Sequence, residues 1–390
     1  MRPVMLICAG ALVAPMDSAV NTAFPAIVAA FALQPHEIQW VILPFVLAQS
    51  IASVAFGRWG DLRGHRRVFT LGMAFCVIAH GGVTLSQDVT ALVVWRCVQG
   101  VAVGMAISCA PALITASTPS AQRPRVLALY SAAISVGVIL GPLLGGVLVT
   151  WWGWQGVFGF RCALSLVVLM LIPAWLPPHA QGVEADASAS PSPPIAWRAL
   201  LSPRFRSLQF TAIVMYLATF SILLWIPFLL AAWTELSIAI AGCVLAAFPL
   251  GSFAASLVAA RIPWTLRADR SNVLISLGLG CATVGLAATA ACALLHSALA
   301  LSLALFGCGL GLGCFQAGHF ELTLRMVPSS NSGLAGSLIT VVRLVGLMVG
   351  VPALSVLGAT LGIAVTLGVS ALVLGSWTLG WHRFRGSTDR

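Results

Sequence analysis

The chain contains no lysine and few charged residues of any kind. All twenty basic residues are arginine, and only 8% of the 390 residues are charged. A nucleotide-binding loop of the Walker type and a Schiff-base site both require a lysine, so the sequence excludes both sites. So little charge cannot cover a soluble globule with polar surface, and a soluble fold is excluded as well.

Residue spacings typical of metal sites and catalytic groups are also missing. The ten cysteines are scattered in or beside apolar segments, without a C-x-x-C pair or a Cys/His cluster. No nucleophile, base and orienting group can be assembled from the sequence. We therefore expect no metal, no cofactor and no enzymatic activity, and we interpret the cysteines as small core residues.

Long apolar segments make up most of the chain, which is 59% hydrophobic with a mean hydropathy of +1.01. A helix that crosses a bilayer needs about 20 apolar residues, and about twelve segments reach that length. We expect an all-α integral membrane protein in the plasma (inner) membrane, with the lipid bilayer as its solvent. The expected crossings are 4–29, 38–57, 68–86, 89–114, 125–150, 156–176, 207–232, 237–260, 271–294, 297–319, 333–356 and 358–381.

The arginines predict the orientation of these crossings. If the N-terminus lies in the cytoplasm, seventeen arginines fall on the cytoplasmic side and the six opposite loops carry none. The positive-inside rule then places both termini in the cytoplasm. The net charge of +10 reports attraction to an anionic inner leaflet, and a nucleic-acid partner is not expected. The seventeen are Arg2, Arg58, Arg63, Arg66, Arg67, Arg123, Arg125, Arg198, Arg204, Arg206, Arg261, Arg267, Arg270, Arg325, Arg383, Arg385 and Arg390.

A polar island, residues 57–69, reads G-R-W-G-D-L-R-G-H-R-R-V-F between two apolar runs, and we expect it to be a loop. It resembles the loop between helices 2 and 3 of the major facilitator superfamily, whose pattern is G-x-L-x-D-R-x-G-R-[KR]. The resemblance implies a gating role; the alternative is a generic positive cytoplasmic loop. The matching residues are Gly57, Asp61, Arg63, Gly64, Arg66 and Arg67.

The first crossing carries a carboxylate, Asp17, with Asn21 four residues later on the same helix face. An acid near mid-bilayer costs about 2.5–3.5 kcal/mol on insertion scales and by default marks a functional interior site. The alternative is a structural aspartate bonded to a neighbouring helix. The D-x-x-x-N-x-A-x-P segment resembles the first-helix signature of drug:proton antiporters, the multidrug efflux branch of this superfamily that normally has fourteen helices.

The fourth crossing contains W-R-C-V-Q-G-V-A-V-G, where Arg96 shares a helix face with Gln99 and two glycines. A cation at membrane depth needs a partner, and Asp17 is the best-placed acid if the two helices adjoin. Otherwise Arg96 reaches towards one membrane face. The run resembles the R-x-x-Q-G signature of the superfamily, which implies that Arg96 takes part in proton coupling. Among other polar groups, we expect His80 to be a hydrogen-bonded interior residue rather than a proton relay.

The fifth crossing contains S-V-G-V-I-L-G-P-L-L-G-G, a glycine strip suited to close helix packing. It resembles the antiporter signature of the superfamily's fifth helix, carried here by Gly137, Gly141, Pro142, Gly145 and Gly146. After it, we expect Trp151, Trp152 and Trp154 to form an interfacial aromatic belt. We expect Arg161, just beyond them, to reach back to that interface.

Residues 177–206 are rich in Pro, Ser and Ala and predict a cytoplasmic linker. Six crossings precede the linker and six follow it. We therefore expect two pseudo-symmetric six-helix bundles, residues 1–176 and 207–390, as in the major facilitator fold.

The second half offers fewer polar groups. Glu321 could take up a proton, but an ion pair with Arg325 is favoured; for Arg343, helix packing is the default because Gly346 follows it. One set of residues resembles a pattern of the fourteen-helix antiporters, although this chain lacks their two additional helices. That set is Pro328, Gly333, Gly336, Arg343, Gly346 and Gly350.

The resemblance implies a proton-coupled exporter, an antiporter, of apolar or amphipathic small molecules that works by alternating access as a monomer. Asp17 and Arg96 are the expected proton-coupling residues. The alternatives are a dedicated metabolite or sugar exporter of the same fold and a non-transporting membrane sensor or assembly partner. The residues expected to line a substrate cavity are Asn21, Gln49, Gln99, Tyr216, Gln316 and His319.

Overall fold

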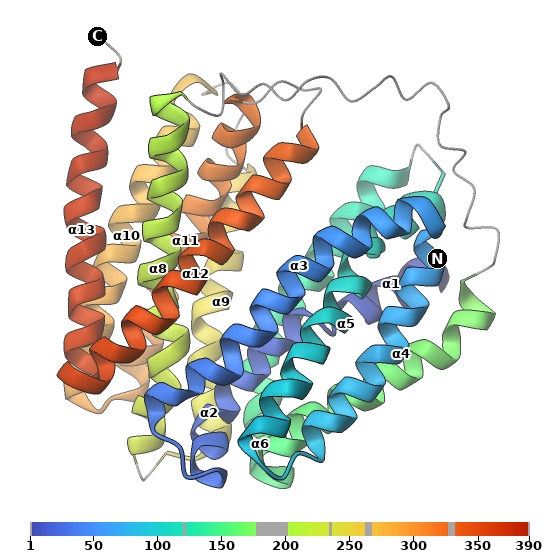
Figure 1. Cartoon of the computed structure of the whole chain (residues 1–390). Helices are drawn as coiled ribbons and strands as arrows, with labels where there is room; N and C mark the ends of the chain where they lie inside the picture. Colours follow the sequence, from blue (N-terminus) through green and yellow to red (C-terminus); the bar gives the residue numbers. More distant parts are fainter. Residues whose placement is uncertain are drawn as a thin grey trace. The chain divides into compact units, whose positions relative to one another are not determined.

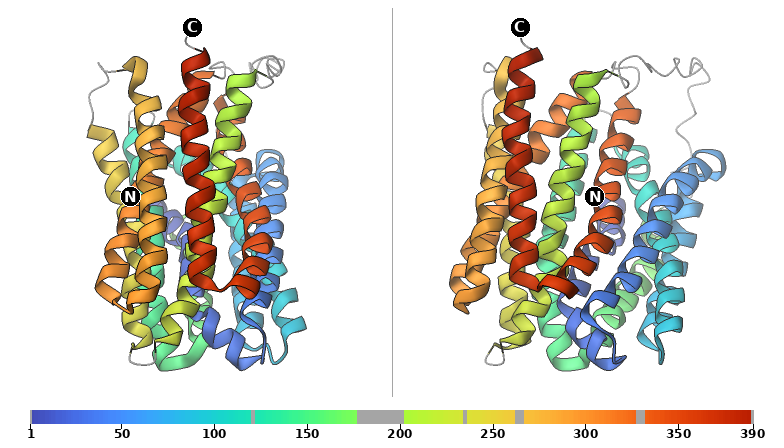
Figure 2. Two further views of the ribbon diagram at one scale, coloured as in Figure 1. Left: turned by 90° about the vertical axis from the view of Figure 1, so that its left-hand side faces the viewer. Right: turned by 60° about the vertical axis from the view of Figure 1, so that its left-hand side comes forward.

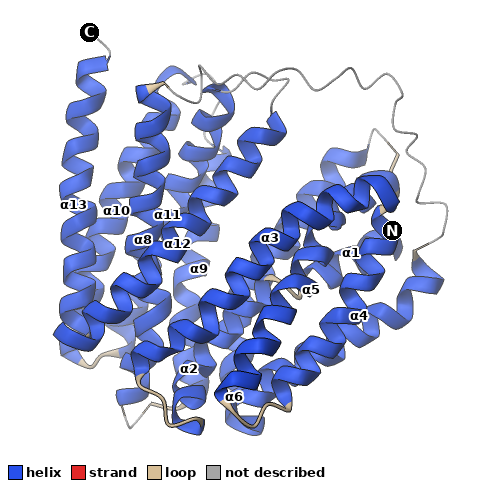
Figure 3. Cartoon of the chain, in the orientation of Figure 1, coloured by secondary structure: helices blue, strands red, loops and turns tan. Residues whose placement is uncertain are grey.

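The computed structural model describes residues 2–119, 122–176, 202–233, 236–261, 267–326 and 332–388. Within these ranges every regular element is a helix, and Figure 3 draws no strand there. The prediction of an all-α membrane protein is confirmed, because eleven of the described helical segments are long and apolar enough to cross a bilayer.

The chain divides into two compact units, the first comprising Met1–Ala189 with Ser237–Gly242 and the second Ser190–Leu236 with Cys243–Arg390. Most of the predicted linker, residues 177–201, lies outside the described residues, and its last residues, from Pro203, are the first turn of a helix.

In the first unit, α5 packs against α3 and α4, while α6 packs against α2 and α4. The elements of this unit, drawn in Figure 1, are α1 (Arg2–Ala11), η1 (Pro15–Asp17), α2 (Ser18–Ala30), η2 (Pro35–Ile38), α3 (Gln39–Arg63), α4 (His65–Thr84), α5 (Val89–Ala116) and α6 (Arg123–Trp175).

In the second unit, α13 runs beside α8 and α10, as Figure 2 shows, and α10 also packs along α11. Helices α11 and α9 approach closely, because a Cβ on Gly309 would lie 2.0 Å from the carbonyl oxygen of Phe248. The remaining helices are α8 (Pro203–Ala232), α9 (Ile238–Arg261), α10 (Arg267–Leu295), α11 (Ala298–Met326), α12 (Ser332–Leu361) and α13 (Ile363–Thr388).

The first crossing is a broken helix. Helix α1 ends at Ala11, a short 3-10 turn occupies Pro15–Asp17, and α2 begins at Ser18. Pro15 has no backbone N–H and disfavours a continuous α-helix through this point. The break places Asp17 at the end of the 3-10 turn, where the backbone leaves the regular helical ladder.

Helix α6 holds two crossings. Its 53 residues would extend about 80 Å if straight, more than twice the thickness of the hydrocarbon core. The backbone turns at Trp152 and at Gly153, whose φ of 64° suits glycine. The two arms joined there correspond to the expected crossings 125–150 and 156–176. Counting both arms, the eleven segments give twelve crossings.

The polar island is not a loop, contrary to the prediction. Helix α3 continues to Arg63 and α4 begins at His65, so only Gly64 separates them. Gly64 has φ 93° and ψ 124°, a backbone conformation that a residue with a Cβ rarely adopts. One glycine therefore makes the turn for which the sequence suggested a longer loop.

Candidate functional site

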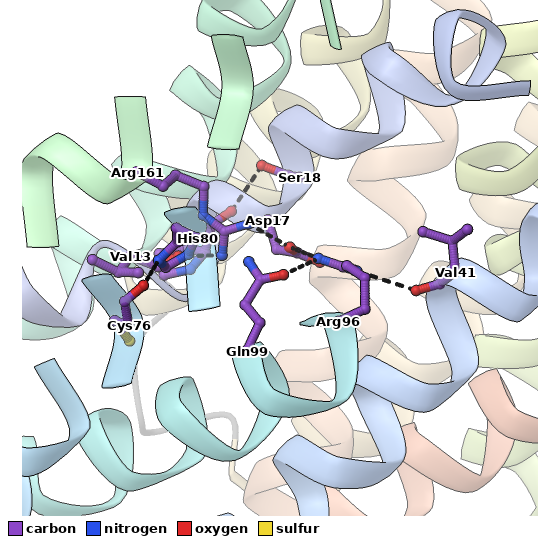
Figure 4. A network of polar contacts seen from close by, with 10 residues as sticks. Val13, Asp17, Ser18, Val41, Cys76, His80, Arg96, Gln99 and Arg161 are labelled. Atoms are coloured by element: carbon purple, nitrogen blue, oxygen red, sulfur yellow. Dashed lines mark hydrogen bonds and ion pairs between the residues drawn. The ribbon is translucent and has the colours of Figure 1, made fainter. Parts of the chain in front are cut away.

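Three charged side chains meet inside the first unit. Oδ1 of Asp17 accepts a hydrogen bond from Nη1 of Arg96 at 2.8 Å and from Nη1 of Arg161 at 2.6 Å. Nη2 of Arg96 lies 3.2 Å from Oδ2 of the same carboxylate. Figure 4 shows both guanidinium groups pointing at Asp17 from different helices. We refer to Asp17, Arg96 and Arg161 as the charge cluster.

Arg96 is fully enclosed by its surroundings. Its side chain is 1% exposed, its Nε donates to the carbonyl oxygen of Val41 at 3.1 Å, and its Nη1 also donates to Oε1 of Gln99 at 2.8 Å. The guanidinium carbon lies 4.1 Å from the ring centroid of Phe45, a cation–π arrangement. Arg96 therefore does not reach towards a membrane face, and the structure brings it to Asp17.

Arg161 occupies a different place from the one expected. Its side chain is 0% exposed, and its Nη2 donates to the carbonyl oxygen of Val13 at 2.9 Å, inside the break between α1 and α2. The expectation that it reaches the interface is wrong. Arg161 lies eight residues beyond the bend at Gly153, about 12 Å along the helix, and a buried cation within a crossing needs an anion as its partner.

The charge cluster carries a net positive charge, because two guanidinium groups face one carboxylate. The Asp17 side chain is 23% exposed, whereas both arginines are buried. The other acids among the described residues 2–176 lie at helix ends. Asp17 is thus the only anion inside a crossing that the described residues of this unit offer to the two buried cations.

The glycine strip of α6 packs directly against the Asp17 segment. A Cβ on Gly141 would lie 1.9 Å from Oγ of Ser18, and one on Gly145 would lie 2.6 Å from the carbonyl oxygen of Ala19. The Ser18 hydroxyl donates to the carbonyl oxygen of Val138 at 3.2 Å. Two motifs that the sequence gives separately, in the first and fifth crossings, thus form one contact. Of the other antiporter-motif residues, Gly137 packs on Leu12, Pro142 accepts from Thr22, and Gly146 lies in the same arm of α6.

His80 lies beside the cluster on α4 and is 0% exposed. Its Nδ1 is 2.5 Å from the carbonyl oxygen of Cys76, so it is a hydrogen-bonded interior residue, as predicted. Its Nε2 has no hydrogen-bond partner within the described part of the chain.

The polar-island residues lie on both sides of Gly64. Gly57, Asp61 and Arg63 belong to α3, while Arg66 and Arg67 belong to α4. Nε of Arg66 donates to the carbonyl oxygen of Leu176 at 2.9 Å, which caps the C-terminal end of α6. The island therefore contacts the C-terminal end of α6.

The residues expected to line a cavity are distributed over both units. Gln99 is buried and bonded to Arg96, whereas Asn21 and Gln49 are half-buried in the first unit. In the second unit, Tyr216 is 4% exposed and packs edge-to-face on Phe315. His319 is buried with its Nε2 3.1 Å from Oε1 of Gln209, and Gln316 is half-buried. Gln99, Tyr216 and His319 thus have protein neighbours filling their surroundings.

Other sequence expectations have mixed outcomes. Glu321 forms the expected ion pair with Arg325. Arg343 is exposed, so helix packing is wrong for its side chain, although Gly346 does pack against Tyr216.

Of the three tryptophans expected in the aromatic belt, Trp154 is 4% exposed and contacts Phe31, so only Trp151 and Trp152 have the exposure expected of a belt. Pro328 lies outside the described residues.

Comparison with known proteins gives a match to one family. The model of the family described as Major Facilitator Superfamily matches residues 6–351.

Curated relatives match only part of the chain. A riboflavin transporter, RibZ, of Clostridioides difficile is 25% identical over 174 residues, which is 44% of this chain and 38% of the relative. The tetracenomycin C resistance and export protein of Streptomyces glaucescens is 28% identical over 43% of this chain and 31% of the relative. The probable multidrug resistance protein EmrY of Escherichia coli is 31% identical over 40% of this chain and 31% of the relative. The chain covers well under half the length of each.

Solved structures match over nearly the whole chain. A bacterial homologue of the human lysosomal transporter Spinster, in an inward-facing and unoccupied conformation, has a TM-score of 0.80 at 14% identity and covers 97% of this chain and 95% of its own. A POT family transporter has a TM-score of 0.78 at 11% identity, and the match covers 99% of this chain and 96% of that transporter. At such identities the likeness concerns the fold.

Proposed function

This chain belongs to the major facilitator superfamily of membrane transporters, and on that basis we propose that it is a proton-coupled exporter of small amphipathic molecules. In this proposal, Asp17 takes up a proton from the outer side and releases it to the cytoplasm. Proton entry drives the outward movement of the substrate by alternating access.

The charge cluster is the observation that carries this proposal. A carboxylate within a membrane crossing is costly, and Asp17 lies at a helix break rather than in a regular helix. It contacts arginines from α5 and α6, and the segment around it packs on the glycine strip. A proton bound at Asp17 would change its contacts to two helices, α5 and α6, at once.

Protonation of Asp17 requires a rearrangement of this cluster. In the structure, two guanidinium groups stabilise the ionised carboxylate, and a neutral acid would leave two buried cations without an anion. The protonated form therefore belongs to a second conformation in which the arginines have other partners. Such a two-state element is what couples ion binding to alternating access.

The net charge of the cluster bears on the substrate. A surplus positive charge at membrane depth repels an organic cation, so we propose neutral amphipathic compounds as substrates rather than cationic ones. The name of the tetracenomycin C resistance and export protein supports export as the direction of transport.

A dedicated metabolite transporter is the second candidate. The observation in its favour is the similarity to a protein named as a riboflavin transporter. Response to a single metabolite, with none to unrelated amphipathic compounds, would favour this function over multidrug export.

The testing experiment measures proton release from acidified inverted membrane vesicles when neutral amphipathic compounds are added. We expect the unchanged protein to respond and Asp17→Asn to give no response, since the amide cannot exchange a proton. Glu321→Gln is the matched control, because Glu321 is ion-paired with Arg325 in the second unit and should be dispensable. A proton release that survives Asp17→Asn but disappears in Glu321→Gln would assign the proton site to Glu321. No proton release with any compound would contradict proton-coupled export.

A further inference from the structure

His80 carries an unused hydrogen-bond acceptor next to the charge cluster. A carbonyl oxygen can only accept, so the Nδ1 that lies 2.5 Å from the carbonyl of Cys76 must carry the ring proton. In the neutral imidazole, Nε2 then has a lone pair and no hydrogen. This atom is buried, and the described residues give it no donor.

Arg161 carries the complementary unused donor. Its Nη1 donates to Asp17 and its Nη2 donates to Val13, while its Nε–H is buried without a partner among the described residues. Buried polar groups are normally paired, because an unmade hydrogen bond costs the full desolvation of the group.

The donor and the acceptor belong to turns that contact each other. The thiol of Cys162 donates to the carbonyl oxygen of Val77 at 3.4 Å, and a Cβ on Gly81 would lie 3.9 Å from Sγ of Cys162. These contacts place the turn of α4 that holds His80 against the turn of α6 that holds Arg161. Figure 4 shows the imidazole beside the Arg161 guanidinium, on the side away from Arg96.

We propose that His80 is a positioning residue for proton coupling. When Asp17 becomes protonated, Nε2 of His80 accepts a hydrogen bond from the Arg161 guanidinium. Arg161 keeps its hydrogen bond to Val13 and turns from the carboxylate to the imidazole. The proton itself goes to an oxygen of Asp17 and no proton passes through His80. This proposal rests on the proposed function, because it needs Asp17 to bind a proton.

The surroundings favour a neutral His80 in both states. A protonated imidazole would add a third cation beside two guanidinium groups that share one carboxylate, and is therefore disfavoured. His80 therefore serves as an acceptor rather than a proton relay. The titratable or charged groups around it are Asp17 at the α1–α2 break, Cys76 on its own helix, Arg96 on α5 and Arg161 on α6, while the thiol of Cys162 on α6 contacts the carbonyl of Val77 in the same turn of α4.

The experiment follows the carboxylic acid absorption of Asp17 by infrared difference spectroscopy on the purified full-length protein, with Asp17→Asn to assign the band. In His80→Leu the released Arg161 has no acceptor besides the carbonyl of Val13, so the state with protonated Asp17 is less stable. We expect the pH at half-protonation to fall by about one to two units. In His80→Gln the side-chain oxygen can still accept, and the midpoint should stay near that of the unchanged protein.

A second comparison isolates the partner of His80. In an Arg161→Gln background, His80→Leu should leave the midpoint unchanged, because there is no guanidinium to accommodate. If His80→Leu does not fold, His80→Phe provides a second side chain without an acceptor.

The possible results separate the two proposals. Equal midpoints in the Leu, Gln and unchanged proteins would overturn the role of His80 and leave the proton site intact. If His80→Gln lowers the midpoint as much as His80→Leu does, the role of His80 as an acceptor is overturned, and His80 is then a proton relay. Absence of an Asp17 band in the unchanged protein would overturn proton binding at Asp17 and, with it, the role of His80.

Discussion

Nη1 of Arg161 lies 2.6 Å from Oδ1 of Asp17, although 144 residues separate the two in sequence. The contact joins the second arm of α6 to the break in the first crossing. It makes Asp17 the shared partner of two buried cations, since Arg96 binds the same oxygen. This arrangement determines how the variants of the cluster should behave.

Removing the anion should cost more stability than removing the second cation. Asp17→Asn leaves two buried guanidinium groups without a counter-ion, and we expect a loss on the order of 3 kcal/mol. Arg161→Gln leaves the Asp17–Arg96 pair intact and should cost less. Thermal unfolding in detergent, followed by tryptophan fluorescence, measures both. Adding Arg161→Gln to Asp17→Asn should recover part of the loss, and the reverse order of stabilities would contradict the shared-anion arrangement.

Gly145→Ala should destabilise the first unit. The new methyl group would lie 2.6 Å from the carbonyl oxygen of Ala19, a backbone atom that cannot move alone. We expect a cost of about 1–3 kcal/mol from overpacking, together with reduced transport. Gly280→Ala on α10 is the control, because a Cβ there meets nothing within 4 Å. Similar melting temperatures for the two variants would show that α6 does not pack tightly on the Asp17 segment.

The turn between α3 and α4 should tolerate only glycine at Gly64. With φ at 93°, alanine there is strained, and we expect a loss of about 1–2 kcal/mol. Gly57→Ala tests a neighbouring motif position, where the added Cβ would make an ordinary 3.6 Å contact with Ser108. That variant should be close to neutral. The comparison is again of unfolding temperatures, and a neutral Gly64→Ala would contradict the single-residue turn.

Charge selectivity should follow the surplus cation. Between two amphipathic compounds of similar size, the neutral one should give the larger proton response in inverted vesicles. In Arg161→Gln the cluster becomes neutral, so the response to the cationic compound should rise relative to the neutral one. A stronger response of the unchanged protein to the cation would contradict the proposed substrate class.

The arginine asymmetry predicts a cytoplasmic C-terminus. A fluorescent protein fused after Arg390 should fluoresce, and alkaline phosphatase fused there should be inactive, since it requires the oxidising side of the membrane. Fusions after Gln34, in the first expected outer loop, should give the opposite pair of results. Active phosphatase at the C-terminus would reverse the predicted orientation.

The fold was largely predictable from the sequence, because each bilayer crossing is recognisable as a long apolar run. Turn geometry was less so: the charges of residues 57–69 suggested a loop, whereas one glycine suffices between α3 and α4. The connection after Thr150 is similarly short. Hydropathy separates the two crossings there, but it does not show that Trp152 and Gly153, with its positive φ, are enough to join them.

The site was predictable where its residues form local motifs. Asp17 and Arg96 each lie in a recognisable sequence motif. Their contact was predicted because a buried cation needs an anion as its partner. Arg161 has no such run around it, and its nearness to the tryptophans favoured an interfacial position. Its role depends on which helix lies opposite, and that is set by the packing of the glycine strip on Ser18 and Ala19.

The bend at Gly153 has a mechanical consequence for this unit. One arm of α6 presents the glycine strip to the backbone around Ser18, and the other arm holds the Asp17 carboxylate through Arg161. Because only the bend at Trp152 and Gly153 separates the arms, we expect a displacement of one arm along the membrane normal to be passed on to the other. A change in the hydrogen bonds of Asp17 would then move both arms of the hairpin together.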